Sequence, residues 1–255
     1  MGKVVWLGLY RKFNILIVVI FFMGDIGKNI GIGVIGCGGR IRHLLNLLLE
    51  IDSDKVEILG VYDVEDDSIR KCKKVVGNNL RVYDSYEKLV QDPEIDWVII
   101  GSWNKFHAEQ IIASFRAGKH VFCEKPIAIS LEECKKIKGL YVGNVLEFVI
   151  GFTLRYSLHY RKIKEIIDSG KIGRIVSMEF NETLTLGHGG RFMNDWRRYK
   201  ENSGGFLLEK CCHDIDLANW FVGDVARKVA SFGDLNFFVK ENSNVYDFSK
   251  GDKTF

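Results

Sequence analysis

The chain has 255 residues, of which 47% are hydrophobic and 27% are charged, and its net charge is +3. This composition is typical of a globular protein and excludes a disordered, collagen-like or low-complexity chain. At about 150 residues per domain, the length predicts one large or two modest domains. The small net charge gives no indication of a nucleic-acid surface, so we expect no nucleic-acid partner.

The six cysteines are scattered along the chain. No two of them form a Cys-x-x-Cys pair, and none has the His/Cys spacing of a zinc site. Scattered cysteines in a chain of this size indicate reduced core residues rather than a disulfide framework. We therefore expect a cytoplasmic protein without a metal site.

An unbroken apolar run covers residues 15–23 and is preceded by Arg11 and Lys12. A helix that crosses a bilayer needs about 20 apolar residues, so this run is too short. The following Met-Gly-Asp-Ile does not resemble a signal-peptide cleavage site. We expect residues 1–29 to be an N-terminal extension and no membrane partner, with a signal or anchor segment as the alternative.

From Ile30 onward, short apolar runs rich in β-branched residues alternate with stretches of helical period. The predicted strands cover 30–35, 56–62, 97–101, 120–123 and 148–153, and the predicted helices cover 40–50, 66–76, 85–91, 106–117 and 130–138. This alternation predicts βαβ units, and hence an α/β domain whose doubly wound parallel sheet has helices on both faces. We assign residues 30–153 to this domain.

After Arg155 the pattern changes. Helices are predicted over 156–168 and 204–220, whereas 175–186 and 229–238 alternate in polarity as in strands of a sheet with one open face. The last seventeen residues are polar and show no clear period. We expect residues 154–255 to form an α+β domain with an open-faced, largely antiparallel sheet, which is shortened and incomplete.

The stretch Gly36-Cys37-Gly38-Gly39-Arg40 follows the first predicted strand and opens the first helix. Without side chains at Gly36, Gly38 and Gly39, backbone N–H groups can approach a pyrophosphate at the positive end of the helix. The third glycine of a full Gly-x-Gly-x-x-Gly motif is replaced by Ile41. The alternative is a glycine turn that only connects a strand to a helix.

Asp63 ends the second predicted strand, 25 residues after Gly38. A carboxylate at this place can accept hydrogen bonds from the hydroxyls of an adenosine ribose. Because it would repel a 2′-phosphate, Asp63 favours NAD. Arg40 leaves NADP as an alternative, since an arginine after the turn can face a phosphate.

Pro126, one of only two prolines, stands in Glu124-Lys125-Pro126 at the end of a predicted strand. Ligands of open α/β sheets bind beyond the carboxyl ends of the strands, so this tripeptide should lie in the cofactor crevice. A lysine there suits proton transfer or polarisation of a carbonyl. The alternative is a surface lysine at a strand end.

Several motifs together resemble the Gfo/Idh/MocA oxidoreductase family. They are Gly36-x-Gly38, Ser102-Trp103-Asn104 with His107, Gly118-Lys119-His120-Val121, Glu124-Lys125-Pro126, Gly151-Phe152-Thr153-Leu154-Arg155-Tyr156, Gly170-Lys171-Ile172-Gly173, Gly204-Gly205 and His213-Asp214-Ile215-Asp216. The resemblance spans about residues 30–240. It implies a Rossmann domain that binds NAD(P), followed by an α+β domain whose open sheet face is the expected interface of a homo-oligomer if that domain folds.

The resemblance also implies the activity and the roles of individual residues. Family members oxidise or reduce a sugar, a cyclitol or a related polyol. By motif match, Asn104 and Glu124 would lie beside the nicotinamide ribose and carboxamide, and Lys125 would contact the reacting hydroxyl. Ser102 and His107 are also expected to contact the cofactor. The peptide bond between the lysine and the proline of the Glu-Lys-Pro motif is often cis in this family.

His213 is the strongest histidine candidate for catalysis. Glu209 lies four residues before it on the same helical face, and a carboxylate beside an imidazole orients its tautomer. The family has an aspartate at the position of Glu209, which is one methylene longer. Further candidates for substrate contacts are Arg155, His188, Arg197 and Asp214. For the first three, a solvated loop position or a structural ion pair is the alternative.

We therefore expect an NAD(P)-dependent dehydrogenase that transfers a hydride between nicotinamide and a carbon of a small polyol or sugar. A non-catalytic dinucleotide-binding sensor is the first alternative, because a fold does not fix a function. The second alternative is a degenerate fragment of such an enzyme, since family members have a longer second domain.

Overall fold

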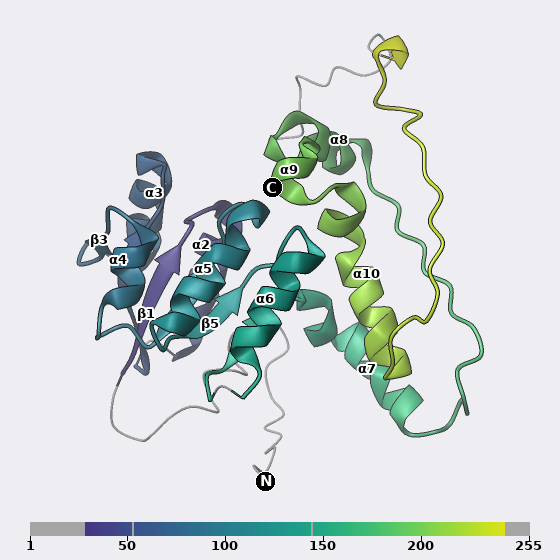
Figure 1. Ribbon diagram of the computed structural model, residues 1–255, viewed down its shortest axis with the longest axis horizontal. Helices are drawn as coiled ribbons and strands as arrows, with labels where there is room; N and C mark the ends of the chain where they lie inside the picture. Colours follow the sequence, from purple (N-terminus) through teal and green to yellow (C-terminus); the bar gives the residue numbers. More distant parts are fainter. Residues whose placement is uncertain (1–28, 53, 144, 243–255) are drawn as a thin grey trace.

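The computed structural model describes residues 29–52, 54–143 and 145–242 (Figure 1). The predictions for the N-terminal extension and its apolar run fall almost entirely outside these residues, as does most of the polar end of the chain. Among the helices that are described, none combines the length and the apolar content that a membrane crossing requires.

Six parallel strands form one sheet in the order β3-β2-β1-β4-β5-β6. They are β1 (Ile30–Ile35), β2 (Val56–Tyr62), β3 (Arg81–Val82), β4 (Trp97–Ile100), β5 (His120–Cys123) and β6 (Phe148–Ile150). Five of these strands were predicted from the sequence, and the two-residue strand β3 was not. The strand order reverses between β1 and β4, and ligands of open α/β sheets bind at such a switch point.

Five helices connect these strands: α2 (Gly39–Asp52), α3 (Asp66–Val76), α4 (Tyr86–Gln91), α5 (Asn104–Arg116) and α6 (Leu131–Tyr141). Side chains of α2 and α3 pack in one core cluster, and those of α4, α5 and α6 pack in another. Successive residues of a strand point to opposite faces. Accordingly, Ile99 joins the first cluster while Val98 and Ile100 join the second. The sheet is therefore covered on both faces, as predicted.

Local signals in the sequence set the starts of two helices. The hydroxyl of Ser130 accepts the backbone N–H of Glu133, whose carboxylate accepts the N–H of Ser130 in return. This is a capping box, an arrangement that satisfies two N–H groups without helical partners. At the start of α4, the hydroxyl of Ser85 accepts the backbone N–H of Lys88.

The second half of the chain consists of helices joined by long extended segments (Figure 1). Its helices are α7 (Leu158–Asp168), α8 (Leu186–Asn194), α9 (Lys200–Ser203) and α10 (Phe206–Val222), with short 3₁₀ turns η1 (Thr153–Tyr156), η2 (Trp196–Arg198) and η3 (Lys240–Asn242). α7 and α10 lie side by side, and the rings of Tyr160 and Phe221 are 6.3 Å apart between them. The predicted helices over 156–168 and 204–220 correspond to α7 and α10.

The two strands predicted for the second half are wrong. Residues 175–185 and 229–238 take no part in any strand pairing, and Leu186 begins α8 instead. Alternating polarity yields a strand only where a neighbouring strand supplies hydrogen-bond partners, and the described part of the chain offers none to either segment. Several of their apolar side chains are left in solvent, among them that of Phe232, which is 95% exposed.

The α/β class is thus confirmed, but the open-faced antiparallel sheet is not present among the described residues. The predicted homo-oligomer interface was the face of that sheet, so the described residues do not form it. The boundaries 30–153 and 154–255 remain a prediction. The change from β6 to the turn η1, which begins at Thr153, lies close to the predicted boundary.

Candidate active site

The loops that follow β1, β4 and β5 meet at the carboxyl edge of the sheet. Together with η2 and α10 they enclose a cleft of about 320 Å³. Most of the predicted site residues line it: Gly38, Gly39, Arg40, Ser102, Asn104, His107, Glu124, Lys125, Arg197, Glu209 and His213. Gly36, Asp63, Arg155, His188 and Asp214 are not among the lining residues. The structure therefore brings residues from both halves of the chain to one place.

The turn after β1 has the backbone that a phosphate cradle requires. Gly36 has φ +84°, and a Cβ there would lie 2.5 Å from the backbone nitrogen of Ser102, so only glycine fits. A Cβ on Gly38 would meet no atom within 4 Å. Packing within the protein therefore does not require glycine at Gly38, which borders the open cleft at the start of α2. An open glycine turn at a helix N-terminus fits the pyrophosphate of a dinucleotide.

Asp63 lies beside the turn rather than in the cleft. Its Oδ2 accepts the backbone N–H of Cys37 at 2.6 Å, and its Oδ1 accepts that of Glu65 at 2.9 Å. The carboxylate at the end of β2 therefore fixes the conformation of the glycine turn. Each oxygen has a second lone pair with which it could accept a ribose hydroxyl.

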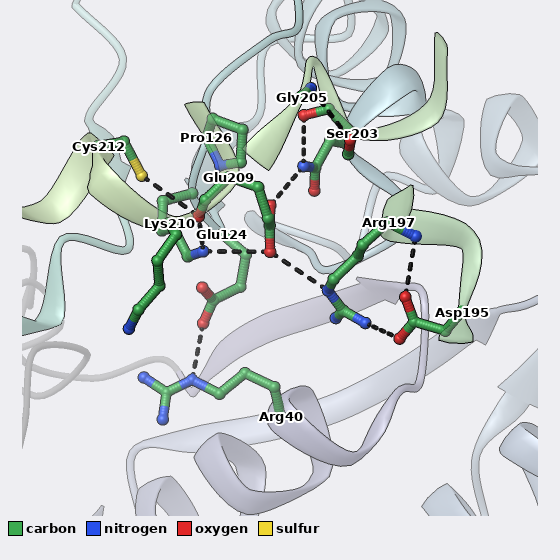
Figure 2. A network of polar contacts seen from close by, with 12 residues as sticks. Arg40, Glu124, Pro126, Asp195, Arg197, Ser203, Gly205, Glu209, Lys210 and Cys212 are labelled. Carbon is green, nitrogen blue, oxygen red and sulfur yellow. Dashed lines mark hydrogen bonds and ion pairs between the residues drawn. The ribbon is translucent and has the colours of Figure 1, made fainter. Parts of the chain in front are cut away.

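Arg40 and Glu124 face each other across the cleft (Figure 2). The Nε of Arg40 donates to Oε1 of Glu124 at 3.0 Å. Arg40 belongs to the first turn of α2, and Glu124 directly follows β5. The ion pair therefore connects the proposed phosphate cradle to the Glu124-Lys125-Pro126 motif, whose Lys125-Pro126 bond is cis, as the resemblance implied.

Glu209 is the central group of the site (Figure 2). Its side chain is only 6% exposed and accepts three hydrogen bonds from side chains of other elements. Nδ2 of Asn104 donates to Oε2 at 2.6 Å, while Nζ of Lys125 at 3.3 Å and Nε of Arg197 at 3.2 Å both donate to Oε1. Lys125 also donates to the backbone oxygen of Glu209 at 2.6 Å. These contacts compensate the burial of the carboxylate.

His107 is buried between the loops that follow β4 and β5. Its Nδ1 lies 2.7 Å from the carbonyl oxygen of Pro126, and its Nε2 lies 3.0 Å from that of Ser102. Burial lowers the pKa of His107. Since both ring nitrogens already face carbonyl oxygens, His107 holds the two loops together, although its ring also borders the cleft.

His213 lies on α10 with an unpartnered nitrogen. Its Nδ1 is buried and has no hydrogen-bond partner. Burial, together with the charges of Lys125 and Lys210, lowers the pKa of His213 from 6.5 to about 4. The imidazole is therefore neutral at physiological pH and has a lone pair to accept a proton.

The predicted contact between Glu209 and His213 is wrong. Although the two residues are one helical turn apart, the carboxylate of Glu209 is bonded to Lys125, Asn104 and Arg197. Two of these three donors are cations, and charge-assisted hydrogen bonds are stronger than a bond to a neutral imidazole. The acidic group of the site thus acts on the lysine rather than on the histidine.

Three predicted substrate residues lie away from the cleft. Arg155 donates two hydrogen bonds to the buried carboxylate of Asp216, at 2.6 and 2.5 Å. This is the structural ion pair that the sequence left as an alternative. His188 is exposed on α8, where its ring stacks on Phe192. Asp214 follows His213 on α10, and burial and the charge of Glu182 raise the pKa of its carboxyl.

Two tryptophans that the sequence reasoning did not select also line the cleft. The rings of Trp103 and Trp196 are stacked, with centroids 5.1 Å apart and an angle of 12° between their planes. Trp103 lies just beyond β4, at the edge of the sheet where ligands bind, and this position was a usable signal. Trp196 lies in the three-residue turn η2, in a stretch whose sequence has no period to interpret.

The strand order, the glycine turn and the cleft at the switch point define a Rossmann-type nucleotide-binding protein. Residues 30–151 match the family model for the NAD-binding Rossmann fold of the Gfo/Idh/MocA oxidoreductases, and residues 164–253 match the model for the C-terminal alpha/beta domain of the same family. The chain therefore belongs to the Gfo/Idh/MocA oxidoreductase family.

Similar curated proteins include the myo-inositol 2-dehydrogenase of Thermotoga maritima, which is 32% identical over 205 residues, or 80% of this chain and 58% of that protein. The putative oxidoreductase YteT of Bacillus subtilis is 29% identical over 212 residues, or 80% of this chain and 50% of that protein. The chain thus spans about half the length of the curated relatives it matches.

Among solved structures, the scyllo-inositol dehydrogenase of Lactobacillus casei with bound NAD(H) and scyllo-inositol is similar, with a TM-score of 0.65 and 31% identity. The match covers 77% of this chain and 57% of that one. The myo-inositol 2-dehydrogenase of Lactobacillus plantarum has a TM-score of 0.68 and 28% identity, over 77% of this chain and 57% of that one.

Proposed function

We propose that the protein is an NAD-dependent oxidoreductase that transfers a hydride between nicotinamide and a hydroxyl or carbonyl carbon of a cyclitol, sugar or related polyol. The observation that carries this proposal is the meeting of the glycine turn, Lys125 and His213 in one cleft. The family and its inositol dehydrogenases support the same chemistry. The polyol is the small-molecule substrate that we propose for this site.

The cleft and its surroundings divide into two parts for the cofactor. The turn from Gly36 to Arg40 would hold the pyrophosphate, and Asp63 would accept the adenosine ribose hydroxyls. Ser102, Asn104, His107, Glu124 and Lys125 would surround the nicotinamide end. Arg40 is already paired with Glu124, and a 2′-phosphate near Asp63 would be repelled, so we propose NAD rather than NADP.

Bound NAD would supply the hydride acceptor, and the protein would manage the proton of the substrate hydroxyl. Neutral His213 accepts this proton through a ring nitrogen. Lys125 donates a hydrogen bond to the same oxygen and stabilises the negative charge that develops there. Glu209 fixes the position of Lys125 through its carboxylate and its backbone oxygen.

The six cysteines are free thiols, three of them in the core of the Rossmann half. This supports our proposal that the protein works in a reducing compartment such as the cytoplasm.

The proposal is tested with the full 255-residue chain by separating binding from turnover. Binding is followed by the fluorescence of NADH, and turnover by the absorbance of NADH formed from NAD with a panel of inositols and sugars. We expect binding and turnover with at least one polyol, and binding without turnover in Lys125→Ala. Binding without turnover across the whole panel in the unmodified chain would instead support a non-catalytic dinucleotide-binding protein.

A further inference from the structure

Arg197 lines the cleft, but its donors are used within the protein (Figure 2). Its Nε donates to Oε1 of Glu209 at 3.2 Å, and its Nη1 donates to Oδ2 of Asp195 at 2.5 Å. Asp195 is held in turn, because its Oδ1 accepts the backbone N–H of Arg197 at 2.8 Å. A guanidinium with two of its three nitrogens committed in this way is poorly suited to bind a neutral polyol.

The oxygen that Arg197 contacts is the one that Lys125 contacts. Oε1 of Glu209 accepts Nζ of Lys125 at 3.3 Å and Nε of Arg197 at 3.2 Å, while Oε2 accepts Asn104 at 2.6 Å. Arg197 and Asn104 therefore hold the carboxylate from both of its oxygens. Without Arg197, the carboxylate could turn about its terminal torsion, and the position of the lysine amine would be less well defined.

A stack of aromatic rings braces the guanidinium. Its central carbon lies 4.4 Å from the ring centroid of Trp196, and Trp196 stacks on Trp103. Trp103 belongs to the loop after β4, whereas Trp196 belongs to η2 in the second half of the chain. The brace therefore fixes Arg197 relative to the sheet edge that carries Asn104.

We propose that Arg197 is a positioning residue for the reaction, which acts on Lys125 through the carboxylate of Glu209, and that it is not a substrate ligand. This inference rests on the proposed function, and of the roles that the sequence left open for Arg197 it takes the structural ion pair rather than the substrate contact. A displacement of about 1 Å at a reacting group lowers turnover on the order of 100-fold. We therefore expect the loss of Arg197 to lower kcat rather than to raise KM.

The kinetic test compares Arg197→Gln, Arg197→Lys and Asp195→Asn. We expect kcat of Arg197→Gln to fall about 10- to 100-fold, with KM for the polyol within about a factor of two of the unmodified value. Asp195 is not among the residues that line the cleft, and Asp195→Asn should also lower kcat, but by a smaller factor than Arg197→Gln. Arg197→Lys should recover part of the loss, because one amine cannot reach Glu209 and Asp195 together.

A double mutant distinguishes a positioning role through Glu209 from direct binding of the substrate. If Arg197 acts through Glu209, Arg197→Gln should cost little more in a Glu209→Gln background, so the effects should be far from additive. Additive effects, or a rise in KM with unchanged kcat, would overturn the inference and identify a substrate ligand.

A second readout does not depend on turnover. The amine of Lys125 is modified with an acylating reagent in the full chain, and its labelling rate is measured by mass spectrometry against the exposed Lys136. We expect Arg197→Gln to raise the relative rate at Lys125 several-fold and Arg197→Lys to raise it less. An unchanged rate in both would overturn the inference. If the unmodified chain shows no turnover with any polyol, a raised rate still supports the positioning role, while the proposed function fails.

Discussion

The Nζ of Lys125 lies 2.6 Å from the backbone oxygen of Glu209 and 3.3 Å from its carboxylate Oε1. Lys125, the second residue after β5, is thus bound to both the backbone and the side chain of Glu209 on α10. The two halves of the chain therefore meet at the group that we propose as the catalytic lysine.

Replacement of Glu209 by Gln should lower kcat by about 100-fold or more, because a neutral amide binds Lys125 and Arg197 more weakly than a carboxylate and has no second oxygen for Asn104. The side chain is 6% exposed and lies against two cations, so the loss of its charge should also destabilise the fold, by about 1–3 kcal/mol. Steady-state kinetics and chemical denaturation measure the two effects. Glu209→Asp is the matched control, since it keeps the charge found in the family. A Glu209→Gln protein with full activity would contradict the role of Glu209.

Replacement of Lys210 by Gln should move the acid limb of polyol oxidation to higher pH. Oxidation needs neutral His213, so the rate falls as the pH drops through its pKa, which is about 4. The charge of Lys210 helps to lower this pKa, and Lys210 also pairs with Glu182 at 2.7 Å. Without the lysine, the pH at the midpoint of the acid limb should increase by several tenths of a unit up to about one unit. The pH profile of kcat/KM measures the shift, and a shift to lower pH would contradict the account.

The same pKa determines how His213 affects stability. Because the folded value of about 4 lies below the ordinary 6.5, the unfolded chain binds a proton that the folded chain does not. The contribution of neutral His213 to the free energy of unfolding is therefore fully present above pH 6.5 and is lost as the pH falls toward 4. His213→Gln should reduce the acid sensitivity of thermal unfolding in this window. An unchanged sensitivity would show that the residue does not titrate as described.

Replacement of Asp63 by Asn should weaken NADH binding about 10-fold and weaken NADPH binding less. The amide oxygen can still accept the N–H of Cys37, but the amide nitrogen cannot accept the N–H of Glu65, so a less well fixed turn contributes to the loss. The charge that repels a 2′-phosphate is gone, and the ribose hydroxyls lose a charge-assisted hydrogen bond worth about 1.5–3 kcal/mol. Fluorescence titrations with NADH and NADPH measure the ratio of their two dissociation constants. An unchanged ratio would place the adenosine ribose elsewhere.

Replacement of Arg155 by Met should destabilise the protein without changing KM. Its removal leaves the carboxylate of Asp216 buried without its ion pair. Since Arg155 is partly exposed, we expect a loss of about 2 kcal/mol in the free energy of unfolding. Denaturant unfolding measures this loss, and an added Asp216→Asn change should recover part of it. A large rise in KM with unchanged stability would restore Arg155 as a substrate contact.

The Rossmann half could be predicted because its signals are local. Strands that are buried on both faces, such as β1 and β4, appear in the sequence as short apolar runs. The glycine turn and Glu124-Lys125-Pro126 each follow such a run, so the topology alone brings them to one edge of the sheet. The same logic placed Lys125 in the cleft before any contact was known.

The remaining site residues depend on contacts between distant parts of the chain. The sequence placed Glu209 on the same helical face as His213, yet the donors that hold its carboxylate come from Asn104, Lys125 and Arg197 on three other elements. No periodicity reveals which of these partners is preferred. Similarly, the alternation over 175–186 describes a strand that would need a neighbour to pair with, and the described residues provide none.

The most direct measurement is the transfer of deuterium from a polyol to the cofactor. The full chain is incubated with NAD and a perdeuterated inositol or sugar from the panel, and the reduced cofactor is analysed by mass spectrometry beside a Lys125→Ala control. We expect one deuterium to reach the nicotinamide ring in the unmodified chain, and we expect this transfer to be nearly absent in Lys125→Ala. A chain that binds NAD but transfers no deuterium from any of these polyols, or a Lys125→Ala protein that transfers it at the full rate, would contradict the account.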